Sequence, residues 1–319
     1  MSAAGGGAVD VLVVGDANPD LLLTGDTVPR FGQAEQLLDT ADLLLGGSAS
    51  IVACGLARLG ARTALAAVVG DDRFGTFVLD EVRAAGVDVS AVTVDGAVPT
   101  GLSVVLSEPH DRAILTLPGT IPSLTATAVR EAVERLGPRH VHVASYFLQP
   151  ELAAALPELL DWLAACGVTV SLDTNWDPSE RWSGLEEVLR RVAVFLPNQE
   201  EALAIAAAVT GEAPGGLDEA ASALSTLGCR VVVKAGAEGG IAFDRGARVA
   251  AAGGLRVEVV DTTGAGDSFD AGYLAALSAG VADEQERLRW AATAGSLSVR
   301  GRGGTAAQAT RPDLLAPVP

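Results

Sequence analysis

The stretch DTTGAGDSFDAG, residues 261–272, brings together residue types that could bind and transfer a phosphate. Apolar residues after Asp267 recur with helical spacing, so the stretch predicts a glycine-bearing turn that opens a helix. The backbone N–H groups of Gly264, Ala265 and Gly266 can converge on one anion there, because the helix end is positive and glycine leaves the backbone accessible. Asp267 would then accept a proton from a hydroxyl that attacks the phosphate. The alternative is that Asp267 only stabilises the helix end as a first-turn acid.

Further polar residues follow the predicted strands of the chain. In an open parallel sheet, ligands bind beyond the carboxyl ends of the strands, so we expect these side chains to lie near one another. Asp and Asn also favour turns for backbone reasons, which is the alternative explanation for part of the group. The residues concerned are Asp16, Asn18, Asp20, Asp71, Asp72, Asp173, Asn175, Asp177, Asn198, Glu201, Lys234 and Asp261.

Two places in this group allow two interpretations each. Asn198 and Glu201 stand three residues apart after a proline, a spacing typical of a helix capping box and equally compatible with a metal or phosphate site. Lys234 is the single lysine among 22 basic residues. It is either kept for a role near a ligand or present by chance.

The order of the predicted elements indicates the fold class. Short apolar strands alternate with helical segments, which predicts an α/β fold: three layers, α/β/α, with a mainly parallel central sheet. Two strand-rich insertions, near residues 17–45 and 98–118, do not fit that sheet, and we expect them to pair with each other as a small β lid. The segment GGSASIVACGLARLG, residues 46–60, predicts a helix with Ser48 as its N-cap.

Charge and composition argue against several classes of protein. The net charge is −18, so the broad basic surface of a nucleic-acid-binding protein is not expected. The sequence has no apolar run of the roughly 18 residues that indicate a membrane span, and its N-terminus lacks a signal-peptide pattern. Cys54, Cys166 and Cys229 lie far apart, which favours buried free thiols in a reducing, cytoplasmic compartment. The common phosphate-loop and dinucleotide-binding glycine patterns are absent from the sequence.

Taken in order, these segments resemble the ribokinase-like, or PfkB, carbohydrate kinases over almost the whole chain. Residues 261–272 are similar to that family's C-terminal signature, and residues 46–60 to its N-terminal signature. Further segments in the expected order are VVGDDRFG, NPD, NQEE and VVVKAGAEGG. The resemblance implies one ribokinase-like kinase domain over residues 1–319, with ATP- and Mg²⁺-dependent phosphorylation of a hydroxymethyl group on a small sugar or sugar acid.

The resemblance also implies roles for individual residues. Asp267 would be the catalytic base, and Gly264, Ala265 and Gly266 would form an anion hole. Arg112 would either reach from the lid to an acid or phosphate on the substrate or lie in solvent. The remaining implied contacts are Asn18, Asp20, Gly46 and Gly47 for the substrate; Asn198, Lys234, Gly236, Gly239, Thr262 and Thr293 for the nucleotide; Glu201 for Mg²⁺ through water; and Asp261 for a monovalent cation such as K⁺.

Three positions depart from the family pattern. Ile51, Ile121 and Thr293 stand where many members have asparagine. A substrate hydroxyl left unpaired costs about 1–3 kcal/mol, so we expect a substrate with fewer hydroxyls than ribose or fructose, another pose, or an apolar base. The alternatives are therefore a nucleoside kinase of the same fold and, from a different class, a nucleotide- or metabolite-binding regulator without turnover. The resemblance further implies a homodimer through the lid.

Overall fold

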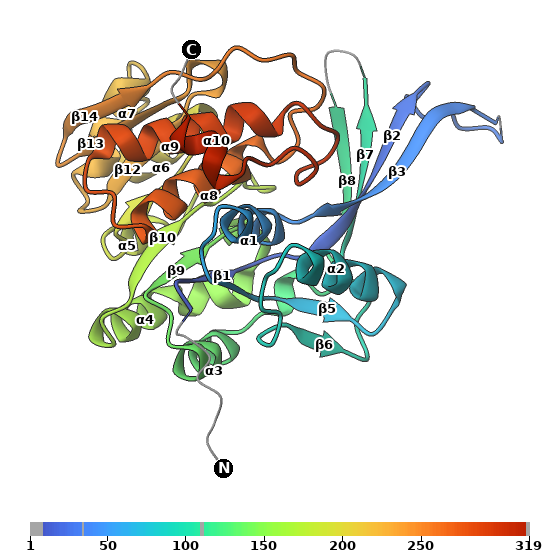
Figure 1. Ribbon diagram of the computed structural model, residues 1–319, viewed down its shortest axis with the longest axis horizontal. Coiled ribbons are helices and arrows are strands. Elements are labelled where there is room, and N and C mark those ends of the chain that lie inside the picture. Colours follow the sequence, from blue (N-terminus) through green and yellow to red (C-terminus); the bar gives the residue numbers. More distant parts are fainter. Residues whose placement is uncertain (1–8, 34, 109–111, 317–319) are drawn as a thin grey trace.

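The computed structural model describes residues 9–33, 35–108 and 112–316, and it confirms the predicted α/β fold (Figure 1). Its main sheet has the strand order β14-β13-β12-β11-β10-β9-β1-β4. The strands from β12 to β4 are parallel, whereas β13 and β14 are antiparallel at one edge. The strands are β1 (Val11–Val14), β4 (Thr63–Ala66), β9 (His140–Val143), β10 (Thr169–Leu172), β11 (Val194–Phe195), β12 (Arg230–Lys234), β13 (Gly240–Asp244) and β14 (Ala247–Ala252).

Helices cover both faces of the main sheet because its strands alternate between two apolar cores. In β1, Val11 and Val13 face one helix layer, and Leu12 and Val14 face the other. The first layer comprises α1 (Ser48–Arg58), α2 (Arg73–Ala84), α8 (Ala265–Ser278), α9 (Glu284–Ser298) and α10 (Arg311–Leu315), and the second comprises α3 (Ala126–Leu136), α4 (Pro150–Ala165), α5 (Glu186–Leu189), α6 (Gln199–Thr210) and α7 (Leu217–Ser225).

The two strand-rich insertions pair in a separate four-stranded sheet that projects from the body (Figure 1). Its order is β3-β2-β7-β8, with β2 parallel to β7. The action of this sheet as a lid stays a prediction, and residues 109–111 at the tip of the β7–β8 connection lie outside the described residues. The strands are β2 (Asn18–Gly25), β3 (Leu38–Gly46), β7 (Leu102–Ser107) and β8 (Arg112–Leu117), and a small parallel pair is formed by β5 (Val68–Gly70) and β6 (Thr93–Asp95).

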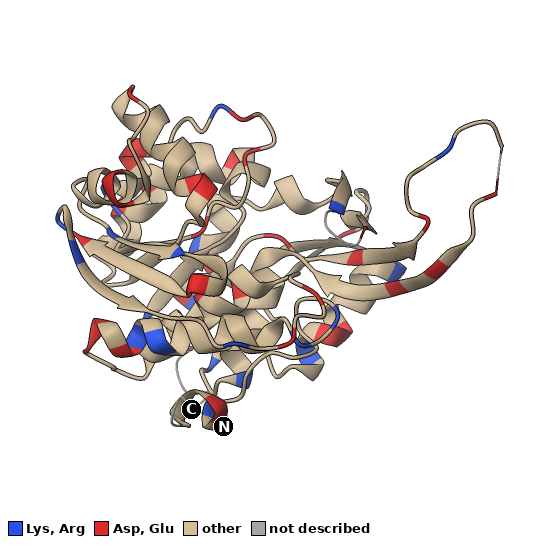
Figure 2. Cartoon of the chain, turned by 90° about the horizontal axis from the view of Figure 1, so that it is seen from above, with Lys and Arg blue, Asp and Glu red and all other residues tan. Residues whose placement is uncertain are grey.

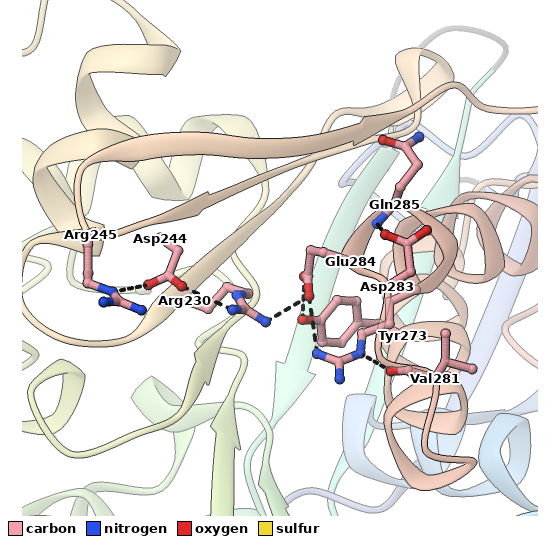
Figure 3. Close-up of polar contacts among 9 residues, drawn as sticks. Arg230, Asp244, Arg245, Tyr273, Val281, Asp283, Glu284 and Gln285 are labelled. Carbon is pink, nitrogen blue, oxygen red and sulfur yellow. Dashed lines mark hydrogen bonds and ion pairs between the residues drawn. The ribbon is translucent and has the colours of Figure 1, made fainter.

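A partly buried charge network ties the start of β12 to helices α8 and α9 (Figure 3). Arg230 donates to Asp244 at 3.0 Å and to Glu284 at 2.7 Å. Glu284 also accepts from Tyr273 Oη at 2.6 Å and from Arg287 at 3.1 Å. The network lies at the amino end of β12, whereas ligands of such sheets bind at the carboxyl ends, so its role is structural.

The surface is rich in acidic residues, as the net charge of −18 requires. Figure 2 shows Asp and Glu both over the body and along the projecting β2–β3 segment. Within the described ranges, none of the helices combines the length and apolar character needed to cross a membrane. Cys54 and Cys229 are buried thiols as predicted, but Cys166 is exposed, because it follows the last turn of α4 and leaves the core there.

Candidate active site

The glycine-bearing turn has the predicted conformation at the start of α8. The helix begins at Ala265, and Gly264 precedes it with a φ of 71°. A Cβ atom added to Gly264 would lie 2.5 Å from the Cα atom of Gly304. Glycine is therefore required at position 264 for two reasons: the backbone is left-handed, and a second chain segment approaches closely.

Backbone amides at this turn are available to an anion. Within the residues that the structure describes, the N–H groups of Gly264, Gly266 and Asp267 donate to no protein acceptor. Ala265 differs, because its N–H donates to Thr262 O at 3.3 Å. Available N–H groups at the positive end of a helix bind anions. The amide of Asp267 thus joins the set that the sequence predicted, and that of Ala265 is partly engaged.

Asp267 lies half-buried in the first turn of α8 and accepts a hydrogen bond at Oδ1 from Ser48 Oγ. Burial raises the pKa of Asp267 to about 7; the Ser48 hydrogen bond opposes this rise, and the carboxylate of Asp173 adds to it. Its second oxygen, Oδ2, has no hydrogen-bond partner in the described part of the chain. A carboxylate with a free oxygen and a pKa near neutrality is suited to accept a proton from a hydroxyl.

The prediction that Ser48 caps its own helix is wrong. Gly47 is the N-cap of α1, with a φ of 78°, and Ser48 is the first helical residue. Asp16, just after β1, supplies the cap instead: its Oδ2 accepts from Ser48 N at 3.1 Å and its Oδ1 from Ala49 N at 3.0 Å. Because the helix end is already capped, the Ser48 hydroxyl is available to Asp267.

A cavity of about 550 Å³ lies beside the turn. Pockets for small molecules usually measure about 300–1,000 Å³. Much of its wall is apolar and includes Leu255, Val257 and Val259, whereas the amide-bearing turn contributes polar groups. Such a cavity suits a ligand with an apolar ring and an anionic group. Residues of the predicted set that line it are Lys234, Gly236, Gly239, Thr262, Ala265 and Gly266.

Thr293, predicted to contact the nucleotide, does not line this cavity. It is 4% exposed and lies in α9 directly after Ala292, which does line it. Neighbouring helical residues point about 100° apart, because a turn holds about 3.6 residues, so Thr293 turns into the core.

Asn198 and Glu201 form the capping box that was one of their two interpretations. Asn198 Oδ1 accepts from Glu201 N at 2.8 Å, and Glu201 Oε2 accepts from Asn198 N at 2.9 Å, at the start of α6. Neither residue is among those that line the 550 Å³ cavity. Burial, helped by Asp173, raises the pKa of Glu201 to about 7. The metal interpretation stays a prediction.

Lys234 lies in a buried cluster with two carboxylates. Its Nζ is 2.7 Å from Asp173 Oδ2 and 3.3 Å from Asp270 Oδ2. Desolvation alone would lower the pKa of Lys234, but the two carboxylates outweigh it and raise the pKa. A Cβ atom added to Gly266 would come within 3.7 Å of Nζ. The ammonium therefore stays charged directly behind the amide-bearing turn.

The two carboxylates of this cluster differ in acidity. Burial would raise the pKa of Asp173, but the charge of Lys234, 2.7 Å away, outweighs it, so the pKa is lowered. Burial raises the pKa of Asp270 well above its ordinary value, and Lys234 offsets only part of the rise. Asp173 is thus the more acidic of the two carboxyl groups beside Lys234.

The predicted substrate residues gather where β2 meets β3. Asn18 Nδ2 donates to Asp20 Oδ1 at 3.1 Å. Burial and the charge of Asp16 raise the pKa of Asp20 to about 7. A Cβ atom on Gly46 would overlap the Asp20 carboxylate, and Gly47 has a left-handed φ of 78°. The packing and backbone of the protein therefore explain why glycine stands at both positions, and their contact with a substrate stays a prediction.

Arg112 and Asp261 meet at Thr263, just before the amide-bearing turn. Arg112 is exposed on β8 and donates to Thr263 Oγ1 at 3.2 Å. Asp261 accepts from Thr263 N at 2.9 Å and from Gly303 N at 2.8 Å. These bonds outweigh burial and lower the pKa of Asp261. Arg112 therefore joins the four-stranded sheet to the site while it remains open to solvent.

The two isoleucines that depart from the family pattern are both buried. Ile51 is 3% exposed, and its side chain lies against Gly264 and Gly304. Ile121 is 4% exposed and packs against Gly101, next to β7. Ile51 therefore places an apolar group at the amide-bearing turn, whereas Ile121 lies at the base of the four-stranded sheet.

Sequence reasoning missed the contact of Ser48 with Asp267 and the part played by Asp270. Asp270 follows Asp267 by three residues, a spacing that places both on one helix face, so this signal was present. The contact between Ser48 and Asp267 joins positions 219 residues apart, and no local pattern indicates it.

Three comparisons with known proteins bear on this site. The family model described as pfkB family carbohydrate kinase matches residues 9–311. The chain is 26% identical to ribokinase of Bacillus subtilis (strain 168), over 96% of this chain and 98% of that protein. It is 32% identical to 2-dehydro-3-deoxygluconokinase of the same strain, over 85% of each. The solved structure of Arabidopsis thaliana ribokinase complexed with ribose and ATP matches with a TM-score of 0.80 and 27% identity, over 97% of this chain and 98% of that one.

Proposed function

The chain belongs to the pfkB family of carbohydrate kinases, and from this premise we propose that it transfers the γ-phosphate of ATP to a hydroxymethyl group of a small sugar or sugar acid. Membership of the family makes it a phosphotransferase that acts on sugar hydroxyl groups. One observation carries the proposal for this chain: Asp267, with a free Oδ2, shares a single helical turn with amides that have no protein acceptor, beside a cavity of about 550 Å³.

The proposed mechanism assigns separate tasks to the residues of this turn. Asp267 Oδ2 takes the proton of the acceptor hydroxyl as its oxygen attacks the γ-phosphorus, and ADP leaves. The amides of Gly264, Gly266 and Asp267 hold the transferring oxygens, and one such donor contributes about 2.7–4 kcal/mol in comparable sites. A general base contributes roughly 10²–10⁴ in rate. Lys234, held behind the turn, adds positive charge where negative charge arrives.

The residues around the turn also suit a cation that arrives with the nucleotide. Burial raises the pKa values of Asp267, Asp20 and Glu201 to about 7, so a cation that arrives with the nucleotide would favour their ionised forms. In the described ranges there is no group of three or more His, Cys, Asp or Glu placed to hold a metal ion. Mg²⁺ bound through phosphates and water, with Glu201 as an outer contact, fits this surrounding and would neutralise phosphate charge. Asp261 is the proposed contact of a monovalent cation such as K⁺.

A nucleoside kinase is the second candidate, and the apolar walls near Asp20 favour it. Leu22, Leu44 and Val105 line the recess between the four-stranded sheet and Asp261. Ile51 lies against Gly264 of the amide-bearing turn. These side chains offer no hydrogen bonds to a hydroxyl, and the recess of about 10 Å³ has room for a ring only if the surrounding side chains move.

The homodimer implied by the resemblance also becomes part of the proposal. Leu22 and Val105 face the recess beside Asp261. Because side chains alternate along a strand, their neighbours Leu21 and Val104 lie on the opposite, outer face of the four-stranded sheet. That outer face carries an apolar row, and exposed rows of this kind are usually covered by a partner. The row runs across all four strands as Leu43, Leu21, Val104 and Leu115.

The test of the function is a panel of acceptors assayed for ADP release with ATP and Mg²⁺. The panel holds D-ribose, D-fructose, 2-keto-3-deoxygluconate and adenosine, so that the best acceptor separates the two candidates. Asp267→Asn should keep the affinity for ATP and lose roughly 10²–10⁴ in kcat, because the amide cannot take the proton. Asp80→Asn, exposed on α2, is the matched control.

Two outcomes would contradict this reasoning. Turnover of Asp267→Asn within about threefold of the wild type would remove Asp267 as the base. Bound ATP without ADP release for every acceptor would favour the non-catalytic regulator instead.

A further inference from the structure

Ser48 has a position that neither helix capping nor the proposed mechanism explains. It is the first residue of α1, it is 6% exposed, and its hydroxyl donates to Asp267 Oδ1. The Ser48 hydroxyl thus occupies one oxygen of the Asp267 carboxylate. In the proposed function, the hydroxymethyl group of the acceptor must reach the other oxygen. We propose that Ser48 is a positioning residue that fixes the Asp267 carboxylate and leaves Oδ2 for the acceptor, an inference that rests on the proposed function.

The backbone of Ser48 is itself held in place. Its N–H donates to Asp16 Oδ2 at 3.1 Å, and the next amide, Ala49 N, donates to Asp16 Oδ1 at 3.0 Å. Ser50 N donates to the backbone oxygen of Asp16 at 3.3 Å. With its main chain fixed at three successive amides, Ser48 can present its hydroxyl to Asp267 in one direction, which loses little entropy when the contact forms.

Asp16 is linked in turn to Ser145 and Asn175, two residues with left-handed backbones. Ser145 Oγ accepts from Asn175 Nδ2 at 2.8 Å, and Ser145 opposes the rise that burial causes in the pKa of Asp16. Ser145 and Asn175 both have left-handed backbones, with φ of 55° and 53°. This conformation is uncommon for serine and is kept where surrounding contacts enforce it, often at functional sites, whereas asparagine adopts it readily. The chain of contacts Asn175–Ser145–Asp16–Ser48–Asp267 therefore links the ends of β9 and β10 to the proposed base.

The Ser48 contact has an electrostatic consequence as well as a geometric one. A hydroxyl that donates to a carboxylate stabilises the ionised form, so it holds the pKa of Asp267 below the value that burial alone would give. The ionised form is the one that can accept a proton. The other charged or titratable groups that act on Asp267 are Asp16 beside α1, Asp173 after β10, Lys234 on β12 and Asp270 on α8.

The experiment compares the pH dependence of kcat/KM in wild type, Ser48→Ala and Ser48→Thr, from about pH 5 to about pH 9. ADP release is measured with D-ribose, D-fructose and 2-keto-3-deoxygluconate. We expect the midpoint of the acid limb to rise by about one pH unit in Ser48→Ala, because the donor to the carboxylate is lost. Ser48→Thr keeps a hydroxyl and should restore the wild-type midpoint.

Ser50→Ala is the matched control, because Ser50 is also buried in the same turn of α1 and its hydroxyl donates only to backbone oxygens of Gly46 and Gly47. It should leave the midpoint in place. The inference is overturned if Ser48→Ala leaves the acid limb unmoved while the wild type turns over, or if Ser50→Ala moves it equally. A wild type that releases no ADP with any of the acceptors would instead count against the proposed function.

A second readout needs no turnover. The folded pKa of Asp267 lies above its ordinary value, so its contribution to stability is full at low pH and is lost as the pH rises through about 7. Ser48→Ala raises that pKa further, and its melting temperature should therefore fall increasingly below that of the wild type between about pH 5 and about pH 8. The difference for Ser50→Ala should not depend on pH. A constant difference for Ser48→Ala would show a merely structural role.

Discussion

Removing the ammonium group of Lys234 should destabilise the fold by an amount that its surroundings define. The Lys234 side chain is 11% exposed, and those of its partners Asp173 and Asp270 are 1% and 0% exposed. Lys234→Met keeps most of the side-chain volume but leaves the ionised Asp173 without its cation. Loss of one partner from a buried ion pair costs about 3–5 kcal/mol. For a chain of 319 residues, that corresponds to a fall in melting temperature of about 5–8 °C.

The two carboxylates should respond differently to amide substitution. Asp173 has a lowered pKa and Asp270 a raised one, so Asp173 is the more acidic of the two partners of Lys234. Asp173→Asn removes the more acidic carboxylate, 2.7 Å from the ammonium, and leaves only Asp270, at 3.3 Å, to ionise in its place, so it should cost more than Asp270→Asn. Asp270→Asn keeps Asp173 as the ion-pair partner of Lys234, and it should cost less than about 1 kcal/mol.

Calorimetric melting at about pH 5 and about pH 8 tests this assignment. In Lys234→Met, the pKa of Asp173 rises above its unfolded value, because burial is no longer opposed by a cation. A group of that kind supports the fold at low pH and loses this contribution as the pH rises through the folded pKa, so the gap to the wild type should widen toward about pH 8. A Lys234→Met cost below about 1 kcal/mol, or equal costs for the two Asn variants, would refute the reasoning.

Two further predictions concern the substrate side and the assembly. Gly46→Ala should displace the Asp20 carboxylate, because the added methyl group overlaps it. KM for the acceptor, measured by steady-state ADP release, should rise more than tenfold while the affinity for ATP is kept. An unchanged KM would show that Asp20 does not bind the acceptor. Leu115→Glu places a charge on an outer-face leucine that is 59% exposed, so it should convert the dimer to a monomer. Light scattering measures the mass of wild type and variant, and circular dichroism should be the same for both. A wild type that is monomeric at micromolar concentration would contradict the proposed dimer.

The sequence determined the fold class and the main parts of the site because these depend on local patterns. Alternating apolar strands and helical segments specify a parallel sheet between helix layers, and the structure has this arrangement. The glycines and acid of residues 264–267 specify a helix start with accessible amides, because φ values and first-turn N–H groups are local properties. The capping box of Asn198 and Glu201 was readable for the same reason, since both partners lie within one turn.

Only the tertiary structure decided which side chains meet across the chain. Lys234 acquires its charged state from Asp173 and Asp270, which come from different elements, and its sequence context gave no sign of either. Ser48 had the residue type and place of an N-cap, but Asp16, 32 residues earlier, supplied the cap and left the hydroxyl for Asp267. A local pattern lists which donors and acceptors are present, whereas packing fixes which of them lie within bonding distance and how far burial shifts their protonation.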